Sequence, residues 1–147
     1  MAEKKENKTV QIIVGLVLIV LMAFFVPKLF NSSGRNSGSS ANKALKEAVA
    51  KINEQAPFMI DANTQFDEMV LVNSRTLKYN FTAINMTKED VDVEEFKESL
   101  IPMAVNQMRT NPQAERIRKL EVTVIYSYVD MNGEFICDIT ITPDMYQ

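Results

Sequence analysis

The chain of 147 residues has no His, no Trp, one Cys and only four Gly. Without His, the Ser-His-Asp and Cys-His nucleophile systems and every His-ligated metal site are excluded. Gly133 is the only Gly after residue 38, so a glycine-rich phosphate loop and a dinucleotide-binding fingerprint are excluded as well. The sequence therefore predicts no catalytic residue, no cofactor, no metal site and no small-molecule substrate.

Two features that resemble chemical sites have simpler explanations. Cys137 lies between Ile136 and Asp138 in a strand pattern, without the cationic neighbours that make a thiol reactive, so we expect a buried structural Cys. The acidic run at residues 89–98 resembles the start of a calcium loop, but it lacks the Gly and the final Glu that such a loop needs. Since acidic residues are favoured in the first turn of a helix, we interpret this run as a capped helix start.

The one long apolar run lies near the N-terminus. From Thr9 to Pro27, nineteen residues carry no charge, and a helix of that length spans about 28 Å, enough for the hydrocarbon core of a bilayer. Three Lys residues precede the run, and the positive-inside rule places such a flank in the cytoplasm. We therefore predict a basic cytoplasmic tail at 1–8 and a single-span transmembrane helix at 9–30 that contacts the lipid bilayer, with a cleaved signal peptide as the alternative.

Composition and charge change after this run. Residues 31–41 contain five Ser and two Gly, which is typical of a flexible linker. Residues 42–147 are enough for one small domain. This domain has a net charge of −6, because the whole chain has −3 and the residues before it have +3. Such an acidic domain does not suit nucleic acid, so we predict no nucleic-acid partner.

Helical and strand patterns alternate within the domain. Apolar residues recur at helical spacing in 42–56, and Pro57 ends that pattern. Residues 67–85 read as two strands around a turn, with apolar and polar residues alternating. A second amphipathic helix is predicted over 92–109, where Pro102 would kink or split it. Two capping boxes are candidates for its start: Thr87 with Asp90, and Asp92 with Glu95.

The C-terminal segment predicts a β-hairpin. Strand patterns at 120–130 and 135–144 flank Asn132 and Gly133, the pair that type I′ turns favour. A two-residue loop would place four pairs of residues opposite one another: Val129 and Ile136, Tyr128 and Cys137, Tyr126 and Ile139, and Val124 and Ile141.

These elements predict an α+β fold in the order α-β-β-α-β-β. Consecutive hairpins usually pair with their neighbours, which gives a four-stranded, mostly antiparallel sheet with both helices on one face, a two-layer domain. Whether a short extra strand forms near 58–60 stays undecided at this point. The predicted core comprises Leu45, Val49, Leu77, Tyr79, Phe81, Phe96, Leu100, Tyr126, Tyr128, Cys137 and Ile139.

The other face of the sheet is the nearest feature to a binding site. We expect it to expose Ile125, Val129 and Ile136 among polar residues, with Ile84 on the other hairpin. Scattered apolar residues are normal on a protein surface. The competing hypothesis is that this face binds a protein partner or a second copy of the chain.

Two stretches carry a resemblance to a known family: "APFMIDANTQFDEMVLVNSRTLKYNFT" and "NPQAERIRKLEVTVIYSYVDMNGEFICDITITPD". From about Pro57 to Asp144 the chain resembles a family of small exported or membrane-anchored bacterial proteins of unknown function. Members of that family often carry a Cys near the positions of Met108 and Tyr146, which this chain lacks. The resemblance implies no catalytic residue.

Together these features favour a non-enzymatic interaction or assembly module, anchored in the bacterial inner membrane with its domain in the periplasm. Two alternatives remain open. One is an immunity or superinfection-exclusion protein that blocks a toxin or a phage. The other is an enzyme that depends on carboxylates alone, which would need a deep cleft with convergent carboxylates.

Overall fold

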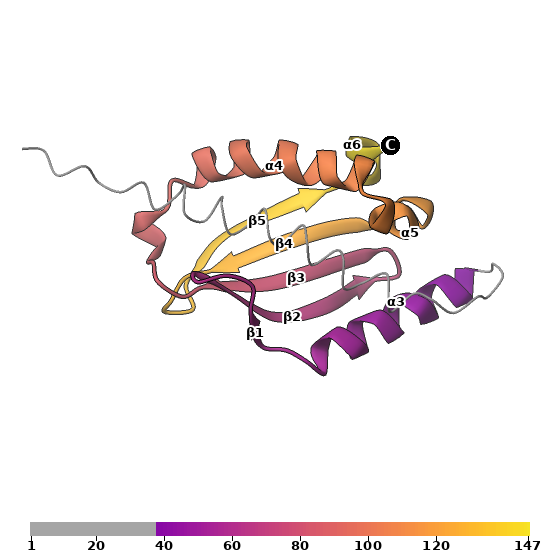
Figure 1. Ribbon diagram of the computed structural model, residues 1–147, viewed down its shortest axis with the longest axis horizontal. Coiled ribbons are helices and arrows are strands. Elements are labelled where there is room, and N and C mark those ends of the chain that lie inside the picture. Colours follow the sequence, from indigo (N-terminus) through magenta and orange to yellow (C-terminus); the bar gives the residue numbers. More distant parts are fainter. Residues whose placement is uncertain (1–37) are drawn as a thin grey trace, which may run out of the picture.

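A five-stranded sheet forms the centre of the structure, a computed structural model that describes residues 38–147 (Figure 1). The strands lie side by side in chain order: β1 (Phe58–Met59), β2 (Thr64–Asn73), β3 (Thr76–Ala83), β4 (Thr123–Val129) and β5 (Phe135–Ile141). The helices are α3 (Gly38–Asn53), α4 (Val93–Thr110), α5 (Glu115–Lys119) and α6 (Pro143–Tyr146), with single 3₁₀ turns η1 (Lys88–Asp90) and η2 (Pro112–Ala114).

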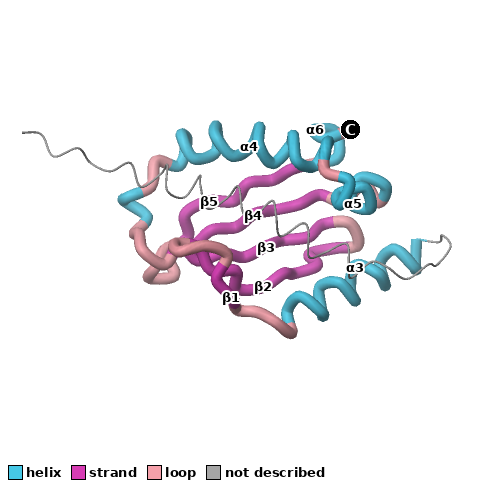
Figure 2. The backbone as a smooth tube through the Cα atoms, viewed as in Figure 1, coloured by secondary structure: helices cyan, strands magenta, loops and turns pink. Residues whose placement is uncertain are grey.

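Neighbouring strands pair in antiparallel fashion except at the centre of the sheet. There β3 and β4 are parallel, with Thr76 opposite Thr123. The reason is visible in Figure 2, where α4 and α5 lead the chain from the end of β3 back to the end at which β3 began. Such a crossover is the usual connection between parallel strands.

The α+β class predicted from the sequence holds, but the predicted architecture is corrected. The sheet has five strands rather than four, because Phe58 and Met59 pair with Phe66 and Gln65 along the edge of β2. Within residues 38–147 no helix is long and apolar enough to cross a membrane. The predicted tail (1–8) and transmembrane helix (9–30) lie outside the described residues. Helix α3 begins at Gly38, inside the predicted linker of 31–41.

The two predicted capping motifs begin two separate elements, α4 and η1. The Asp92 carboxylate accepts the Glu95 backbone N–H at 3.0 Å and so caps α4. One turn earlier, the Asp90 carboxylate accepts the backbone N–H and the hydroxyl of Thr87 at 3.0 and 3.1 Å, which closes η1. Helix α4 then continues through Pro102 to Thr110, so Pro102 does not split the helix, and the alternative of a kink stays a prediction.

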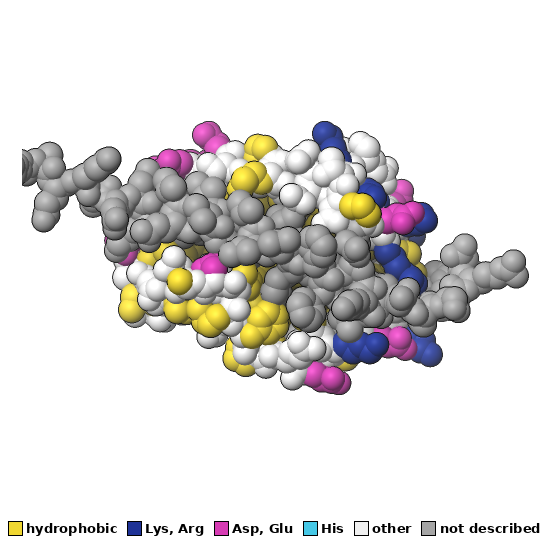
Figure 3. All heavy atoms as spheres, viewed as in Figure 1, with side chains coloured by type: hydrophobic (Ala, Val, Ile, Leu, Met, Phe, Trp, Pro, Cys, Tyr) yellow, Lys and Arg dark blue, Asp and Glu magenta, His cyan; other side chains and the backbone are white. Residues whose placement is uncertain are grey.

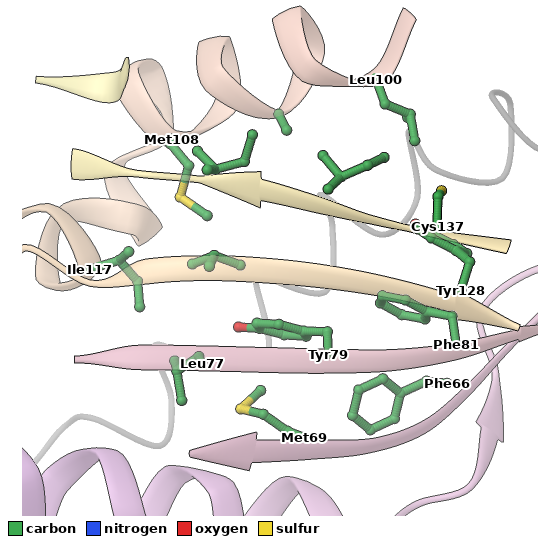
Figure 4. Packing of buried hydrophobic residues seen from close by; sticks show 14 of the residues in the cluster. Phe66, Met69, Leu77, Tyr79, Phe81, Leu100, Met108, Ile117, Tyr128 and Cys137 are labelled. Carbon is green, nitrogen blue, oxygen red and sulfur yellow. The ribbon is translucent and has the colours of Figure 1, made fainter. Parts of the chain in front are cut away.

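The core lies between the helices and one face of the sheet. An aromatic row crosses four strands, with ring centroids 5.0 Å apart from Phe58 to Phe66, 5.8 Å from Phe66 to Phe81, and 5.1 Å from Phe81 to Tyr128. Phe96 of α4 meets Tyr128 edge-on at 5.2 Å, which joins the helix to the row. Figure 4 shows three members of the row, Phe66, Phe81 and Tyr128, on neighbouring strands. Of the predicted core residues, only Val49 and Tyr126 are half-buried rather than buried.

Helix α3 is fixed to the edge of β2 by Asn53, a contact that the sequence did not predict. The Asn53 side chain donates to the carbonyl of Met69 and accepts its N–H, both at 2.8 Å. Since β1 pairs only with the start of β2, the Asn53 amide satisfies backbone groups that β1 does not reach.

Candidate protein-binding surface

One face of the sheet carries no helix among the described residues, because the buried sides of α3 and α4 share a single core with the opposite face. Side chains of this open face alternate along each strand with the buried ones. Three rows of paired residues cross it: Val70, Lys78, Ile125 and Thr140; Glu68, Asn80, Ser127 and Asp138; and Met59, Gln65, Thr82, Val129 and Phe135.

The centre of the open face is polar, and its polar groups bind one another. Lys78 Nζ lies 3.6 Å from Asp138 Oδ2, across the intervening strand β4. The Thr82 hydroxyl donates to Asp67 Oδ2 at 2.7 Å. The Asn80 side-chain amide also donates to Glu68 Oε1 at 3.2 Å. We therefore take the apolar residues at the margins of the face as the candidates for binding.

Five large apolar side chains of the described residues are exposed, and they form two groups. Met59, Val70 and Val72 lie along β1 and β2, with 47%, 36% and 53% of their surface exposed. Met131 and Phe135 lie at the β4–β5 hairpin, with 53% and 52% exposed. Exposed Met and Phe side chains are common in protein interfaces. We call Val129, Met131 and Phe135 the hairpin patch.

The four predicted surface residues differ in their positions. Ile84, Ile125 and Val129 are half-buried, and Ile125 and Val129 lie on the open face as expected. The predicted exposure of Ile136 is wrong, because only 5% of its surface is exposed. Whether the other three residues bind a partner stays a prediction.

A β-bulge explains the burial of Ile136. Tyr128 lies opposite Cys137 as predicted, but Val129 then lies opposite Phe135, and Ile136 is left without a partner across the hairpin. Two residues opposite one is the definition of a bulge, and it places consecutive side chains on the same side of a strand. Phe135 therefore takes the exposed place that the sequence assigned to Ile136.

The turn of the hairpin accounts for the pairing of Val129 with Phe135. The backbone N–H of Gly133 donates to the carbonyl of Asp130 at 3.0 Å, and that of Asp130 donates to Glu134 at 2.8 Å. Within this loop only Gly133 has positive φ, at 80°, so the loop has three residues with Gly in the left-handed position, not the predicted type I′ turn. An Asp followed three residues later by Gly is the sequence signal that could have identified this loop and, with it, Phe135.

The Asp130 carboxylate holds the hairpin tip in place. One oxygen accepts the N–H groups of Asn132 and Glu134 at 2.8 and 2.9 Å, and the other accepts the N–H of Lys88 at 3.0 Å. Burial of this carboxylate favours a higher pKa, but the three backbone donors and the Lys88 charge outweigh it and lower the pKa of Asp130. The hairpin patch is therefore carried on a fixed loop.

The described residues offer little reactive chemistry. Within residues 38–147 no group of His, Cys, Asp and Glu could hold a metal ion. Cys137 is 2% exposed, and burial raises the pKa of its thiol to about 11, which disfavours a reactive thiolate. Burial also raises the pKa of Tyr79, Tyr126 and Tyr128, so these phenols stay neutral.

The fold and this surface define a small α+β domain with one open sheet face. Residues 39–136 match the model of a family described as "Domain of unknown function (DUF8479)". The chain therefore belongs to this family, in agreement with the predicted resemblance to proteins of unknown function. The export that the resemblance implied stays a prediction. No curated protein matches the sequence.

Three solved structures share the fold. A Pseudomonas aeruginosa protein regarded as secreted has a TM-score of 0.59 and 9% identity, over 78% of this chain and 100% of its own. The pilotin EpsS of the Vibrio vulnificus type 2 secretion system has a TM-score of 0.56 and 8% identity, over 75% of this chain and 94% of its own. The pilotin AspS of the Vibrio cholerae type II secretion system has a TM-score of 0.54 and 10% identity, over 74% of this chain and 94% of its own. At these identities the likeness shows the fold alone.

Proposed function

We propose that this protein is a non-enzymatic binding module of the bacterial cell envelope, which binds a protein partner through the hairpin patch of Val129, Met131 and Phe135. The observation that carries the proposal is the exposure of Met131 and Phe135 beside Val129, on an open sheet face and a fixed loop. An exposed apolar group rimmed by polar residues is typical of a protein interaction site.

Two further observations support the proposal. Cys137 is buried and the pKa of its thiol is raised to about 11, which disfavours a nucleophilic role for this residue. Two of the similar structures are pilotins of type II secretion systems, and they show that this fold serves proteins of the secretion machinery. We extend that setting to this chain, with its domain exported from the cytoplasm.

The experiment is affinity capture of the full-length chain from cells of its natural host, with the partners identified by mass spectrometry. Phe135→Ser removes an apolar side chain of the hairpin patch and leaves the net charge unchanged. Val72→Ser is the matched control, because Val72 is equally exposed (53% against 52%) but lies at the other group. We expect Phe135→Ser to lose a partner that the wild-type chain and Val72→Ser both retain. Capture of the same proteins by all three chains would contradict the proposed surface.

Export has its own test. A reporter enzyme that is active only outside the cytoplasm, fused after Gln147, should be active if the domain is exported. A fusion that is stable but inactive, together with activity of a cytoplasmic reporter at the same position, would contradict the envelope location.

A further inference from the structure

The net charge of the domain is confined to two segments. Residues 86–98 contain two Lys and six Asp or Glu, and the hairpin tip at 130–134 adds Asp130 and Glu134, so the two segments together carry −6. The rest of residues 38–147 contains nine basic and nine acidic side chains and is neutral. The whole net charge of the domain therefore belongs to these two segments, which we call the acidic end.

Contacts join the two segments, which are far apart in sequence. The N–H of Met131 donates to the carbonyl of Met86 at 3.1 Å, and the N–H of Lys88 donates to Asp130 at 3.0 Å. Lys88 Nζ also lies 3.5 Å from Glu134. Figure 1 places η1, the start of α4 and the hairpin tip at one end of the molecule, and α5 at the other. In Figure 3 the visible Lys and Arg side chains gather towards the end with α5.

The hairpin patch lies directly at this acidic end. Met131 lies within the hairpin tip and Phe135 follows it directly, and both are more than half exposed. Their neighbours Asn132 and Glu134 donate backbone N–H groups to the Asp130 carboxylate, which holds this part of the loop. Glu89 and Glu94 are exposed and make no ion pair with a described residue. The surface therefore combines an apolar pair with negative charge that the domain itself does not neutralise.

From this combination we infer that the partner presents a basic amphipathic segment, whose apolar side chains contact Met131 and Phe135 while its Lys or Arg side chains face the acidic end. The inference rests on the proposed function and specifies the chemistry of its partner. Complementary charge across an interface speeds association and excludes wrong partners. Negative charge at this end repels nucleic acid and anionic lipid, so a protein segment is the occupant that fits both features.

The test uses two synthetic helical peptides of about 18 residues, or five turns. They share one face of Leu residues, and the opposite face carries Lys in one peptide and Glu in the other. Binding to the full-length chain is measured by fluorescence anisotropy at low and high salt. We expect the Lys peptide to bind, the Glu peptide not to bind, and salt to weaken the Lys complex, because exposed charges are screened.

Two charge-reversed variants locate the binding. Glu89→Lys with Glu94→Lys changes the acidic end, whereas Glu47→Lys with Glu54→Lys makes the same change in net charge on and just after α3. We expect the first variant to weaken binding of the Lys peptide by about tenfold, the effect of a few exposed ion pairs, and the second to weaken it far less. Phe135→Ser should also weaken it, because the apolar contact is lost.

The outcomes separate this inference from the proposed function. Equal weakening by the two charge-reversed variants would mean general attraction to an acidic protein and would overturn the inference. The same holds if the Glu peptide binds as well as the Lys peptide. If Phe135→Ser loses its captured partner but Glu89→Lys with Glu94→Lys retains it, the binding surface stands and the basic chemistry of the partner is wrong. If Phe135→Ser loses no partner, the proposed function itself fails.

Discussion

The carboxylate of Asp130 accepts the backbone N–H of Lys88, a residue 42 positions earlier, at 3.0 Å. The same carboxylate accepts the N–H groups of Asn132 and Glu134. One side chain thus closes the hairpin tip and ties it to the segment before α4. Since the pKa of Asp130 is lowered by these donors, the contact should make stability depend on pH.

We predict that Asp130→Asn destabilises the protein more at neutral pH than in acid. The folded protein holds the pKa of Asp130 below its ordinary value of 3.8, so the ionised carboxylate stabilises the fold above that value. This contribution is lost as pH falls through the lowered pKa, where the folded protein also takes up the proton. Urea unfolding of both proteins from about pH 7 down to about pH 2 measures the difference. Asp144→Asn, an exposed change in α6, makes the same change in charge and is the control.

Much of this fold could be predicted from residue patterns, because strand alternation and helix caps depend on residues that are close together in the sequence. The alternation in 76–83 and 123–129 specifies which side chains face the core, and burial of Leu77, Phe81 and Tyr128 agrees with it. Caps at Thr87 and Asp92 are read from spacing alone. The order of neighbouring strands also follows the chain, as is usual for consecutive elements.

The parts that the sequence did not predict depend on long-range contacts. The edge strand β1 has two residues, too few for a periodic pattern, and its Phe58 packs against Phe66, opposite it on β2, with the ring planes 33° apart. The patch residue Phe135 was missed because a hydrogen bond between Gly133 and Asp130 selects a three-residue loop. One extra residue in the loop places Val129 opposite Phe135, and the bulge at Ile136 then restores the predicted pairing of Tyr128 with Cys137.

Replacing Ile136 tests that register directly. We predict that Ile136→Ala lowers the free energy of unfolding by about 2–5 kcal/mol, the usual cost of emptying a buried aliphatic site, because Ile136 is 5% exposed. Val129→Ala, at a half-buried position on the open face, should cost much less. Denaturant unfolding measures both. Equal losses would contradict the bulge and favour the register in which Val129 faces Ile136.

Substitutions at three Phe residues compare the stability cost of a buried ring with that of an exposed one. Phe81 and Phe96 are each 1% exposed, whereas Phe135 is 52% exposed. We predict that Phe81→Ala and Phe96→Ala each cost about 3–5 kcal/mol of stability, and that Phe135→Ala changes it by less than about 0.5 kcal/mol, as surface substitutions usually do. A large loss of stability for Phe135→Ala would show that this side chain supports the fold instead of being free to bind a partner.

The thiol of Cys137 should be unreactive in the folded protein. It is 2% exposed, and burial raises its pKa to about 11, so at about pH 8 little thiolate is present and reagents cannot reach it. We predict that a thiol reagent labels the chain completely in denaturant and only slowly without it. Labelling at the same rate in both conditions would show that β5 opens readily or that Cys137 is exposed.

Two buried Tyr hydroxyls provide the last prediction, because they differ in their partners. Tyr146 Oη donates to the carbonyl of Val122 at 2.7 Å, which fixes the C-terminal helix α6 to the segment before β4. Tyr128 Oη is buried without a hydrogen-bond partner among the described residues. Removing a bonded hydroxyl costs about 1 kcal/mol, whereas removing an unpaired buried one abolishes its desolvation cost.

We therefore predict opposite effects of the same chemical change. Tyr146→Phe should lower the free energy of unfolding by about 1 kcal/mol, and Tyr128→Phe should leave it unchanged or raise it by about 1 kcal/mol. Each variant serves as the control of the other, since both remove one oxygen from a buried ring. If Tyr128→Phe destabilises the protein as much as Tyr146→Phe, the Tyr128 hydroxyl has a partner, and the packing of the aromatic row beneath Phe96 must be revised.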